Sequence, residues 1–322
     1  MAPRASEGFN GAFIFDRSPI FFIFKTGSRF FFSKSIPDFN RKIDSGSGSR
    51  LNRLHNVSPE SPPATFLAED ANTLSMQVTF LGTNGWFDTP TGNTVSVLVQ
   101  TRDYDIIFDA GNGIAKADRY ISQKKPVCLF ISHFHIDHIA GLHTLVKFRL
   151  KKGLTIYCMP GGSALIHTFA SEPFTVPLEK LPFPARAVEL EEGVHRLPFT
   201  VECRPLVHPA PCYGYRLEAD GRTIAFCTDT GVCDNAVLLG RNADLLITEC
   251  GLKPGESSPD WPHLNPQDAI GIAQRAGAKR LALTHFGAEV YRTLEERKAV
   301  QDTFEPICPG LIAATDDLTV EI

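Results

Sequence analysis

The segment His133-Phe-His135-Ile-Asp137-His138 limits the fold of this chain more than any other feature. It directly follows the apolar run VCLFIS, which is typical of a buried strand. Three histidines and one aspartate within six positions form a dense set of the ligands that Zn²⁺ prefers. An ordinary polar loop rarely gathers so many of them. The sequence therefore predicts a metal site at a strand end, with side chains that can point at different metals.

Further ligands must come from distant parts of the chain, because one loop cannot close two metal sites. His208, Asp229 and His285 each end an apolar, strand-like run. A single residue in such a place is more often a cap or a satisfied polar group, but three in the same kind of position favour metal ligands. Asp109 also ends a strand, and there we expect it to orient a ligand histidine or to shape the turn.

The apolar pattern after residue 75 predicts an α/β protein in which helices cover two sheets. Asn265 and Pro266 are typical of a helix start, and Gly277 of a helix end. The predicted strands span 76–82, 94–100, 104–109, 127–132, 154–158, 199–206, 213–218, 223–228, 244–249, 280–284 and 318–322. The predicted helices span 113–123, 139–150, 162–170, 266–277 and 293–303.

Composition excludes several classes of protein. The chain has 322 residues, 43% of them hydrophobic, which suffices for a sizeable core. A net charge of −4 disfavours nucleic-acid binding through bulk charge. No stretch of about 18 apolar residues occurs, so no membrane span is expected. The eight cysteines form no C-x-x-C pair, and several lie in apolar runs, which indicates free thiols and a cytoplasmic protein.

Residues 1–75 differ from the rest of the chain. They hold phenylalanine clusters such as IFDRSPIFFIF, followed by a Ser/Gly/Pro-rich stretch that is typical of a linker. We expect 1–75 to be an N-terminal extension, disordered or not part of the enzyme, and 76–322 to be the catalytic domain. Met76 as the natural start is one interpretation. A targeting segment is another, although scattered acidic residues argue against it.

These motifs together resemble those of the metallo-β-lactamase-fold hydrolases, over nearly all of 76–322. The H-x-H-x-D-H pattern is highly specific to that superfamily, and the four distant residues match its other motifs in order. The resemblance implies an αββα sandwich of two mixed sheets flanked by helices, with a two-metal site along one edge of the sheets.

The resemblance also implies a ligand set for two Zn²⁺ ions. One ion would be held by His133, His135 and His208. The other would be held by Asp137, His138 and His285, with Asp229 bridging the two. Mn²⁺ and Fe²⁺ stay open as alternatives, because His/Asp sites accept several metals. No ligand is missing, which argues against a member without catalytic activity.

Other segments resemble those of ribonuclease Z and related phosphodiesterases. They include FLGTNGWFDTPTGNT at 80–94, CYGYRL at 212–217 and HLNPQDAIGIAQRAG from 263. By position, Glu249 and His263 correspond to a Glu and a His of that branch, where the His is thought to protonate the leaving oxygen. The alternatives are an exposed loop His263 and a Glu249 that supports a neighbour or caps a helix.

One departure weighs against tRNA cleavage. Ribonuclease Z proper carries an inserted arm that grips tRNA, and in the common bacterial form it follows the GYR-type strand. Here YGYRLEADGRTIAF passes from strand to strand through a tight Ala-Asp-Gly turn, which leaves no room for an arm. Cyclic-phosphate phosphodiesterases of the same branch also lack the arm.

We therefore expect a dinuclear zinc phosphodiesterase that acts on a small or cyclic phosphodiester or on an RNA end. A hydroxide that bridges the metals would attack phosphorus. Asp137 would bind a metal and also orient this hydroxide. The alternatives are a tRNA 3′-processing endoribonuclease, a thioester or lactone hydrolase of the same fold, and a metal-binding protein without turnover. Homodimers are common in this branch, so a homodimer stays open, whereas a membrane partner is not expected.

The substrate pocket is less well defined by the sequence. Its walls are expected to come from residues 84–93, 159–198 and 252–263. Trp86, Phe87 and Trp261 lie in two of these segments, where they would either stack on a base or sugar or pack within the protein.

Overall fold

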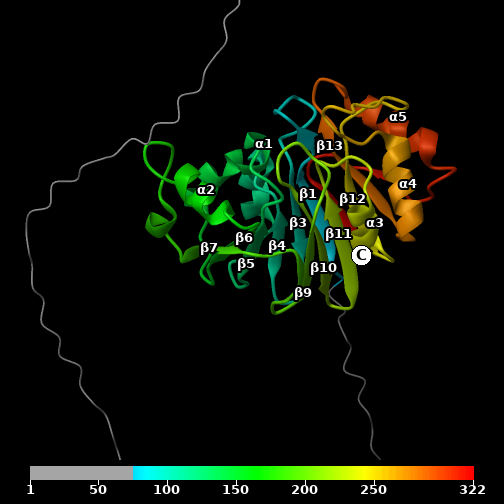
Figure 1. Cartoon of the computed structure of the whole chain (residues 1–322). Helices are drawn as coiled ribbons and strands as arrows, with labels where there is room; N and C mark the ends of the chain where they lie inside the picture. Colours follow the sequence, from blue (N-terminus) through cyan, green and yellow to red (C-terminus); the bar gives the residue numbers. More distant parts are fainter. Residues whose placement is uncertain (1–74) are drawn as a thin grey trace, which may run out of the picture. The chain divides into compact units, whose positions relative to one another are not determined.

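The computed structural model describes residues 75–322 (Figure 1), so the predicted extension at 1–75 lies outside the described residues apart from Ser75. Within this range, none of the helices is both long and apolar enough to cross a membrane. All eight cysteines lie in the described part of the chain and are free, and six of them are buried.

Two mixed sheets form the centre of the structure. The first has the order β15-β1-β3-β4-β5-β6-β7, with antiparallel pairs from β15 to β4 and parallel pairs from β4 to β7. Its strands are β1 (Gln77–Gly82), β3 (Ser96–Gln100), β4 (Asp105–Phe108), β5 (Val127–Phe130), β6 (Leu154–Cys158), β7 (Ala185–Glu189) and β15 (Leu318–Glu321).

The second sheet has the order β14-β13-β12-β11-β10-β9-β8, and the short β2 pairs with β13. The run from β11 to β14 is parallel, and β8 to β11 are antiparallel. Its strands are β2 (Asn84–Gly85), β8 (Gly193–Arg196), β9 (Thr200–Pro205), β10 (Tyr213–Ala219), β11 (Arg222–Cys227), β12 (Leu245–Cys250), β13 (Leu281–Gly287) and β14 (Ile312–Ala313).

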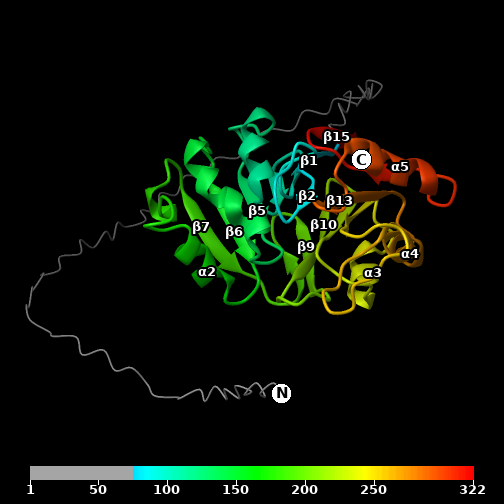
Figure 2. The same ribbon diagram turned by 90° about the horizontal axis from the view of Figure 1, so that it is seen from above.

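Helices cover the outer face of each sheet, which gives the predicted order of helices, sheet, sheet and helices (Figures 1 and 2). The first sheet is covered by the 3₁₀ helices η1 (Asn112–Arg119) and η2 (Ala140–Lys147) and by α2 (Gly162–Phe169). The second is covered by α3 (Asp234–Gly240), α4 (Pro266–Ala276) and α5 (Leu294–Phe304). The short α1 (Ile136–Ile139) and η3 (Leu178–Lys180) complete the set.

The core between the sheets follows from strand alternation, because successive side chains point to opposite faces. On β4, Ile106 and Phe108 point between the sheets, whereas Ile107 points toward the covering helices. Across the interface, the Phe108 ring stacks on the Phe226 ring, with centroids 5.0 Å apart and planes at 13°. The central strands, such as β4, β5 and β12, are therefore buried on both faces, which explains their apolar runs in the sequence.

Most local predictions hold, and the exceptions have physical reasons. The Asn265 side chain caps α4 by accepting from the Asp268 N–H, and Gly277 ends it at a φ of 65°. The segments at 113–123 and 139–150 contain the 3₁₀ helices η1 and η2 rather than longer α-helices. Apolar residues spaced by three and four positions fit both kinds of helix, so the pattern does not separate them. The sequence predicted none of β2, β7, β8, β14, α1, η3 and α3. Of these, β7 and β8 are only partly buried, so they lack the continuous apolar run that identifies the central strands.

The stacked rings between the sheets generate a stability prediction. Phe226→Ala should lower the free energy of unfolding by about 3–5 kcal/mol, because it opens a cavity in a fully buried core. Phe174, which is 68% exposed, is the matched control, and Phe174→Ala should change stability by less than about 0.5 kcal/mol. Urea denaturation of the full chain measures both values. Equal losses for the two variants would contradict the assignment of the core.

Candidate metal centre

The predicted metal ligands meet where parallel strands of both sheets end. Asp109 follows β4, and the loop with His133 follows β5 in the first sheet. Asp229 follows β11, and His285 lies near the end of β13 in the second sheet. The carboxyl ends of parallel strands lie at one edge of a sheet, which is where ligands bind in open α/β sheets. The two sheets bring their edges together, so residues far apart in sequence share one site.

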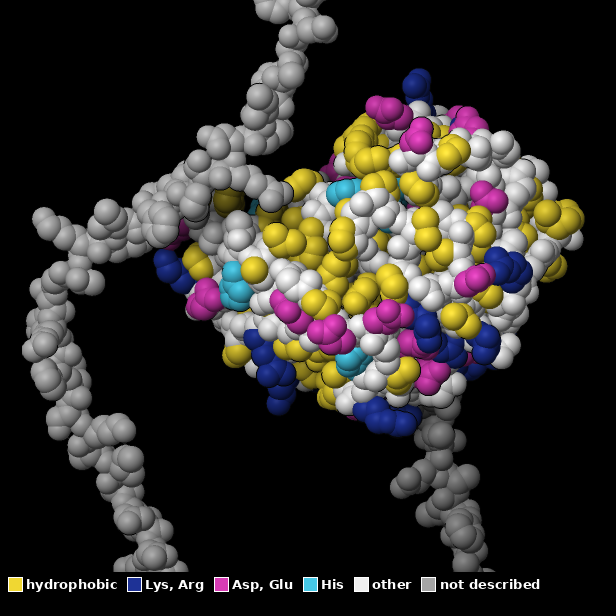
Figure 3. Space-filling view, viewed as in Figure 1, with side chains coloured by type: hydrophobic (Ala, Val, Ile, Leu, Met, Phe, Trp, Pro, Cys, Tyr) yellow, Lys and Arg dark blue, Asp and Glu magenta, His cyan; other side chains and the backbone are white. Residues whose placement is uncertain are grey.

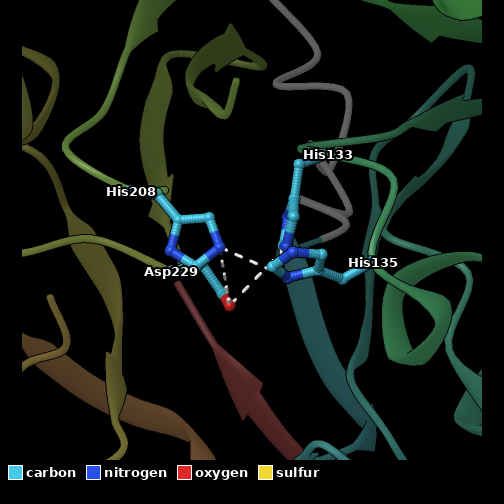
Figure 4. Close-up of side chains that lie close together, drawn as sticks. All are labelled: His133, His135, His208 and Asp229. Carbon is cyan, nitrogen blue, oxygen red and sulfur yellow. Dashed lines mark hydrogen bonds and ion pairs between the residues drawn. The ribbon is translucent and has the colours of Figure 1, made fainter. Parts of the chain in front are cut away.

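The first cluster consists of His133, His135, His208 and Asp229, shown in Figure 4. One possible ligand atom of each residue lies within 4.8 Å of those of the others. The Nε2 atom of His208 lies 3.3 Å from Nδ1 of His135. His133 and Asp229 are buried, and the other two are partly buried. Three imidazoles and a carboxylate around one point form a donor set that suits Zn²⁺.

The second cluster consists of Asp137, His138 and His285, and Asp229 lies between the two clusters. Oδ1 of Asp229 is 3.2 Å from Nε2 of His138 and 3.1 Å from Nε2 of His285. Its Oδ2 is 3.7 Å from Nε2 of His133. The two oxygens of this carboxylate therefore face different clusters, as a bridging ligand requires.

Several residues at this edge hold an unusual backbone conformation. Asp109, Asp229 and His285 have φ angles of 59°, 55° and 47°. This left-handed region is uncommon for residues other than glycine, and strain of this kind is concentrated at functional sites. Asp109 and Asp229 come just after the ends of β4 and β11, whereas His285 lies within β13, where the pairing with β12 changes register. The backbone at the strand ends is therefore held in conformations that few non-glycine residues adopt.

Asp109 lies beside the second cluster and supports one of its histidines. Its Oδ2 is 2.7 Å from Nδ1 of His138, and its Oδ1 accepts the Ser132 N–H at 2.7 Å. Both carboxylate oxygens are thus occupied by neighbours, and His138 is left with Nε2 facing the other ligands. A carboxylate on the second nitrogen of a ligand histidine fixes the ring and its tautomer.

The possible ligand atoms of the two clusters are better suited to binding metal ions than to forming hydrogen bonds with one another. Buried polar atoms usually have hydrogen-bond partners, but Nε2 of His133 and Oδ1 of Asp229 have none with good geometry. Burial and the neighbouring His138 lower the pKa of His133 well below its usual range. Burial also lowers the pKa of His208 to about 4. Both are therefore neutral at pH 7, which is the form that binds a metal.

Glu249 and His263 form a pair beside the two clusters. Nδ1 of His263 lies 2.7 Å from Oε2 of Glu249, whose Oε1 accepts the Thr230 N–H at 2.6 Å. Burial alone would lower the pKa of His263, but the charge of Glu249 raises it to about 9. His263 therefore carries a proton at neutral pH. Its ring also lies within reach of Asp229 and His285, so a role as a metal ligand is the competing interpretation.

The loop after β2 contacts the site through its backbone, which the sequence does not reveal. The Trp86 N–H donates to Oδ2 of Asp137 at 2.7 Å, and Trp86 has a φ of 75°. Gly85 lies against the His285 ring, where a Cβ atom would collide with it. Pairing of β2 with β13 sets this close approach.

A buried arginine also holds the segment around β2 in place. Arg297 of α5 is fully buried and donates to Oγ1 of Thr83 and of Thr91, each at 2.9 Å, and to Oδ1 of Asn84. Burial lowers the pKa of Arg297 to about 10, so it stays charged at neutral pH. The helix sequence LEERKAV is rich in charges and resembles an exposed face, so only the structure identifies this residue.

A cavity of about 150 Å³ opens beside the two clusters. Its walls come from the loop at 85–86, the segment at 261–263 and the turn at 287–290. The expectation that 159–198 contributes a wall is wrong for this cavity. The turn at 287–290, which follows His285 on β13, forms a wall that the sequence did not predict. A larger cavity of about 760 Å³ lies at the opposite strand ends, with no histidine or cysteine among its lining residues.

Comparison with known proteins agrees with this geometry. Residues 104–286, more than half of the chain, match the family described as "Beta-lactamase superfamily domain". The chain belongs to the beta-lactamase superfamily. The probable metallo-hydrolase YhfI of Bacillus subtilis is 29% identical over 217 residues, or 66% of this chain and 87% of that protein. Its crystal structure covers 77% of this chain and all of its own, with a TM-score of 0.63 and 25% identity.

Two further similarities concern superfamily members named as ribonucleases. Ribonuclease Z of Bacillus licheniformis is 29% identical over 315 residues, or 77% of this chain and 99% of that protein. The crystal structure of human tRNase Z, short form, covers 77% of this chain and 99% of its own, with a TM-score of 0.61 and 25% identity. These findings confirm the predicted metallo-β-lactamase fold and the prediction of a metal-dependent hydrolase.

The contacts of Asp109 generate a prediction about metal affinity. Asp109→Asn should weaken metal binding about 10- to 100-fold, because the amide no longer holds His138 in its binding tautomer. Competition with a chromogenic chelator measures the affinity. The control is Asp105→Asn, a buried aspartate at the other end of the same strand, which should leave the affinity unchanged. An affinity of Asp109→Asn equal to wild type would rule out the supporting role.

Proposed function

We propose that this protein is a two-metal phosphodiesterase, with Zn²⁺ as the expected metal, that acts on a small or cyclic phosphodiester or an RNA end. The observation that carries the proposal is the position of Asp229, which faces both ligand clusters beside the protonated His263. A carboxylate placed where two metals could share it, next to a proton donor, would supply groups that two-metal hydrolysis of a phosphodiester uses.

The residues of the two clusters would hold the metals. When bound, the metals polarise the phosphoryl group and make water a stronger nucleophile at neutral pH. Asp137 accepts the Trp86 N–H through Oδ2 and lies 3.3 Å from Nε2 of His285. Asp137 is therefore fixed from two sides, and its carboxylate can orient both a metal and the attacking water.

His263 supplies the proton for the leaving oxygen in this proposal. Its Nδ1 is bound to Glu249, so the proton on Nε2 is the one available to the substrate. His263 lines the same cavity as His135 and Asp229. The charged Glu249 stabilises the imidazolium and orients the ring, and it is itself held by the Thr230 N–H.

A tRNA 3′-processing endonuclease is the second candidate, favoured by the similarity to proteins named ribonuclease Z. Against it stands the connection between β10 and β11, which consists of Asp220 and Gly221 alone, at φ angles of 50° and 72°. These angles are typical of a tight hairpin turn, so no arm is inserted there. We therefore favour a substrate whose binding needs no contacts far from the metal centre.

The direct test is hydrolysis of bis(p-nitrophenyl) phosphate by the full chain with added zinc or manganese. We expect metal-dependent release of p-nitrophenol, and we expect His133→Ala to abolish it, because that variant removes a buried ligand of the first cluster. Circular dichroism checks that the variant stays folded. No turnover by a folded protein with two metals bound would contradict the proposal and favour thioesters or lactones.

A second variant separates the proton donor from the metal ligands. His263→Ala should lower kcat about 10²- to 10⁴-fold, the usual contribution of a general acid, and keep both metals. Metal content by mass spectrometry is the deciding measurement. Loss of a metal in His263→Ala would instead identify His263 as a ligand.

Glu249→Gln tests the same role through pH. Because the charge of Glu249 raises the pKa of His263 to about 9, wild-type activity should persist until the pH rises through that value. Without the charge, His263 loses its proton at lower pH, so the alkaline decline in kcat should begin earlier. An unchanged alkaline limb would contradict the assignment.

A further inference from the structure

Two large aromatic side chains remain exposed at the mouth of the metal centre. Trp86 is 60% exposed and Trp261 is 40% exposed, and both line the cavity beside the clusters. The ring centroids are 6.2 Å apart with planes at 79°, an edge-on arrangement. Aromatic side chains of this size are usually covered, and in ligand pockets they supply most of the apolar contact area. Their mutual contact leaves ring surface open toward the cavity.

Trp261 packs against two histidines of the first cluster. Its ring lies parallel to the His135 ring, with centroids 5.9 Å apart and planes at 8°. It meets the His208 ring edge-on at 6.0 Å. Trp261 also precedes His263 by two residues on the same segment. Its aromatic surface is therefore placed beside both the metal ligands and the proposed proton donor.

Trp86 is fixed by its backbone. Its left-handed conformation and its N–H bond to Asp137 set the position of the side chain. Arg297 holds the same loop through Thr83, Asn84 and Thr91. Such a backbone conformation is unfavourable in a residue other than glycine, and the surrounding contacts maintain it. The backbone that carries Trp86 is thus held in place by contacts within the protein, and the Trp86 ring contacts the Trp261 ring.

The charge around the cavity restricts what the rings can hold. Of the described residues, those lining this cavity include neither lysine nor arginine, and Glu289 adds an exposed carboxylate. In Figure 3, lysine and arginine side chains gather mainly on the lower part of the visible face, away from the strand ends that carry the site. The lining of the cavity therefore offers no cationic side chain that could bind a long polyanion. A flat ring with amino groups fits better, because Glu289 can accept hydrogen bonds from them.

We propose that Trp86 and Trp261 form a stacking site for the base of a nucleotide, so that the substrate is a small phosphodiester with a nucleobase close to the scissile phosphate. This inference rests on the proposed phosphodiesterase function and names its substrate class. Stacking of a base on an aromatic side chain is tolerant of sequence and needs no cation. The phosphate would lie toward the histidine clusters, and the base between the rings and Glu289.

The chain contains only two tryptophans, so its tryptophan fluorescence comes from this site alone. Titration of the full chain with 5′-AMP, with ribose 5-phosphate and with inorganic phosphate compares ligands that share a phosphate and differ in the base. We expect AMP to quench the fluorescence and to bind about tenfold more tightly than ribose 5-phosphate. Calorimetry gives the same affinities without relying on fluorescence.

Variants assign the effect to the rings. Trp261→Leu should weaken AMP binding about tenfold and leave ribose 5-phosphate binding unchanged, whereas Trp261→Phe should keep most of the AMP affinity. Phe87→Leu is the matched control, because Phe87 neighbours Trp86, is 40% exposed and does not line the cavity. It should bind AMP as wild type does.

The outcomes separate this inference from the function on which it rests. Equal affinities for AMP and ribose 5-phosphate would overturn the stacking site, even if bis(p-nitrophenyl) phosphate is hydrolysed. An AMP preference that Trp261→Leu does not reduce would also overturn it. An AMP preference lost in Trp261→Leu, without hydrolysis of any phosphodiester, would leave the stacking site standing and reject the phosphodiesterase.

Discussion

The buried carboxylate of Asp229 is the group on which the rest of the site depends. It is 3% exposed and lies among histidines of both clusters. Burial alone would favour the neutral acid, but the neighbouring His285 and His138 hold its pKa well below the usual range. A buried negative charge needs compensation on every side. The convergence of imidazoles from two sheets supplies it, and the same convergence creates the ligand set.

The surrounding structure serves to hold these groups at one point. Both sheets end their parallel strands at the same edge, and left-handed residues turn the chain there. Asp109 fixes one histidine ring, and the Trp86 N–H fixes the Asp137 carboxylate. Arg297 lies on α5, which covers the outer face of the second sheet, and donates to Thr83 just before β2. His138 and Asp137 are thus held by neighbours that are not themselves in the two clusters.

The sequence predicted much of this because metal ligands are chemically distinctive. The dense His-Asp loop and the polar residues at strand ends identify the clusters, and apolar alternation identifies the sheets. Contacts made by the backbone leave no such signal: the Trp86 N–H and the left-handed turns depend on conformation, not on residue type. Arg297 is hidden because a charged residue on a charged helix resembles a solvent-exposed one. Whether Trp86 and Trp261 pack or stay open also depends on neighbours that only the fold brings together.

The pairing of β15 with β1 has a consequence for how the protein is made. The first described strand is completed by the last, and β1 stays an unprotected sheet edge until residues 318–321 have been synthesised. His285 also comes late in the chain, well after the loop with His133. Contacts between such distant segments form slowly, because a long loop must close first. The full ligand set can therefore come together only after the chain has been synthesised as far as His285 and the two sheets have packed on each other.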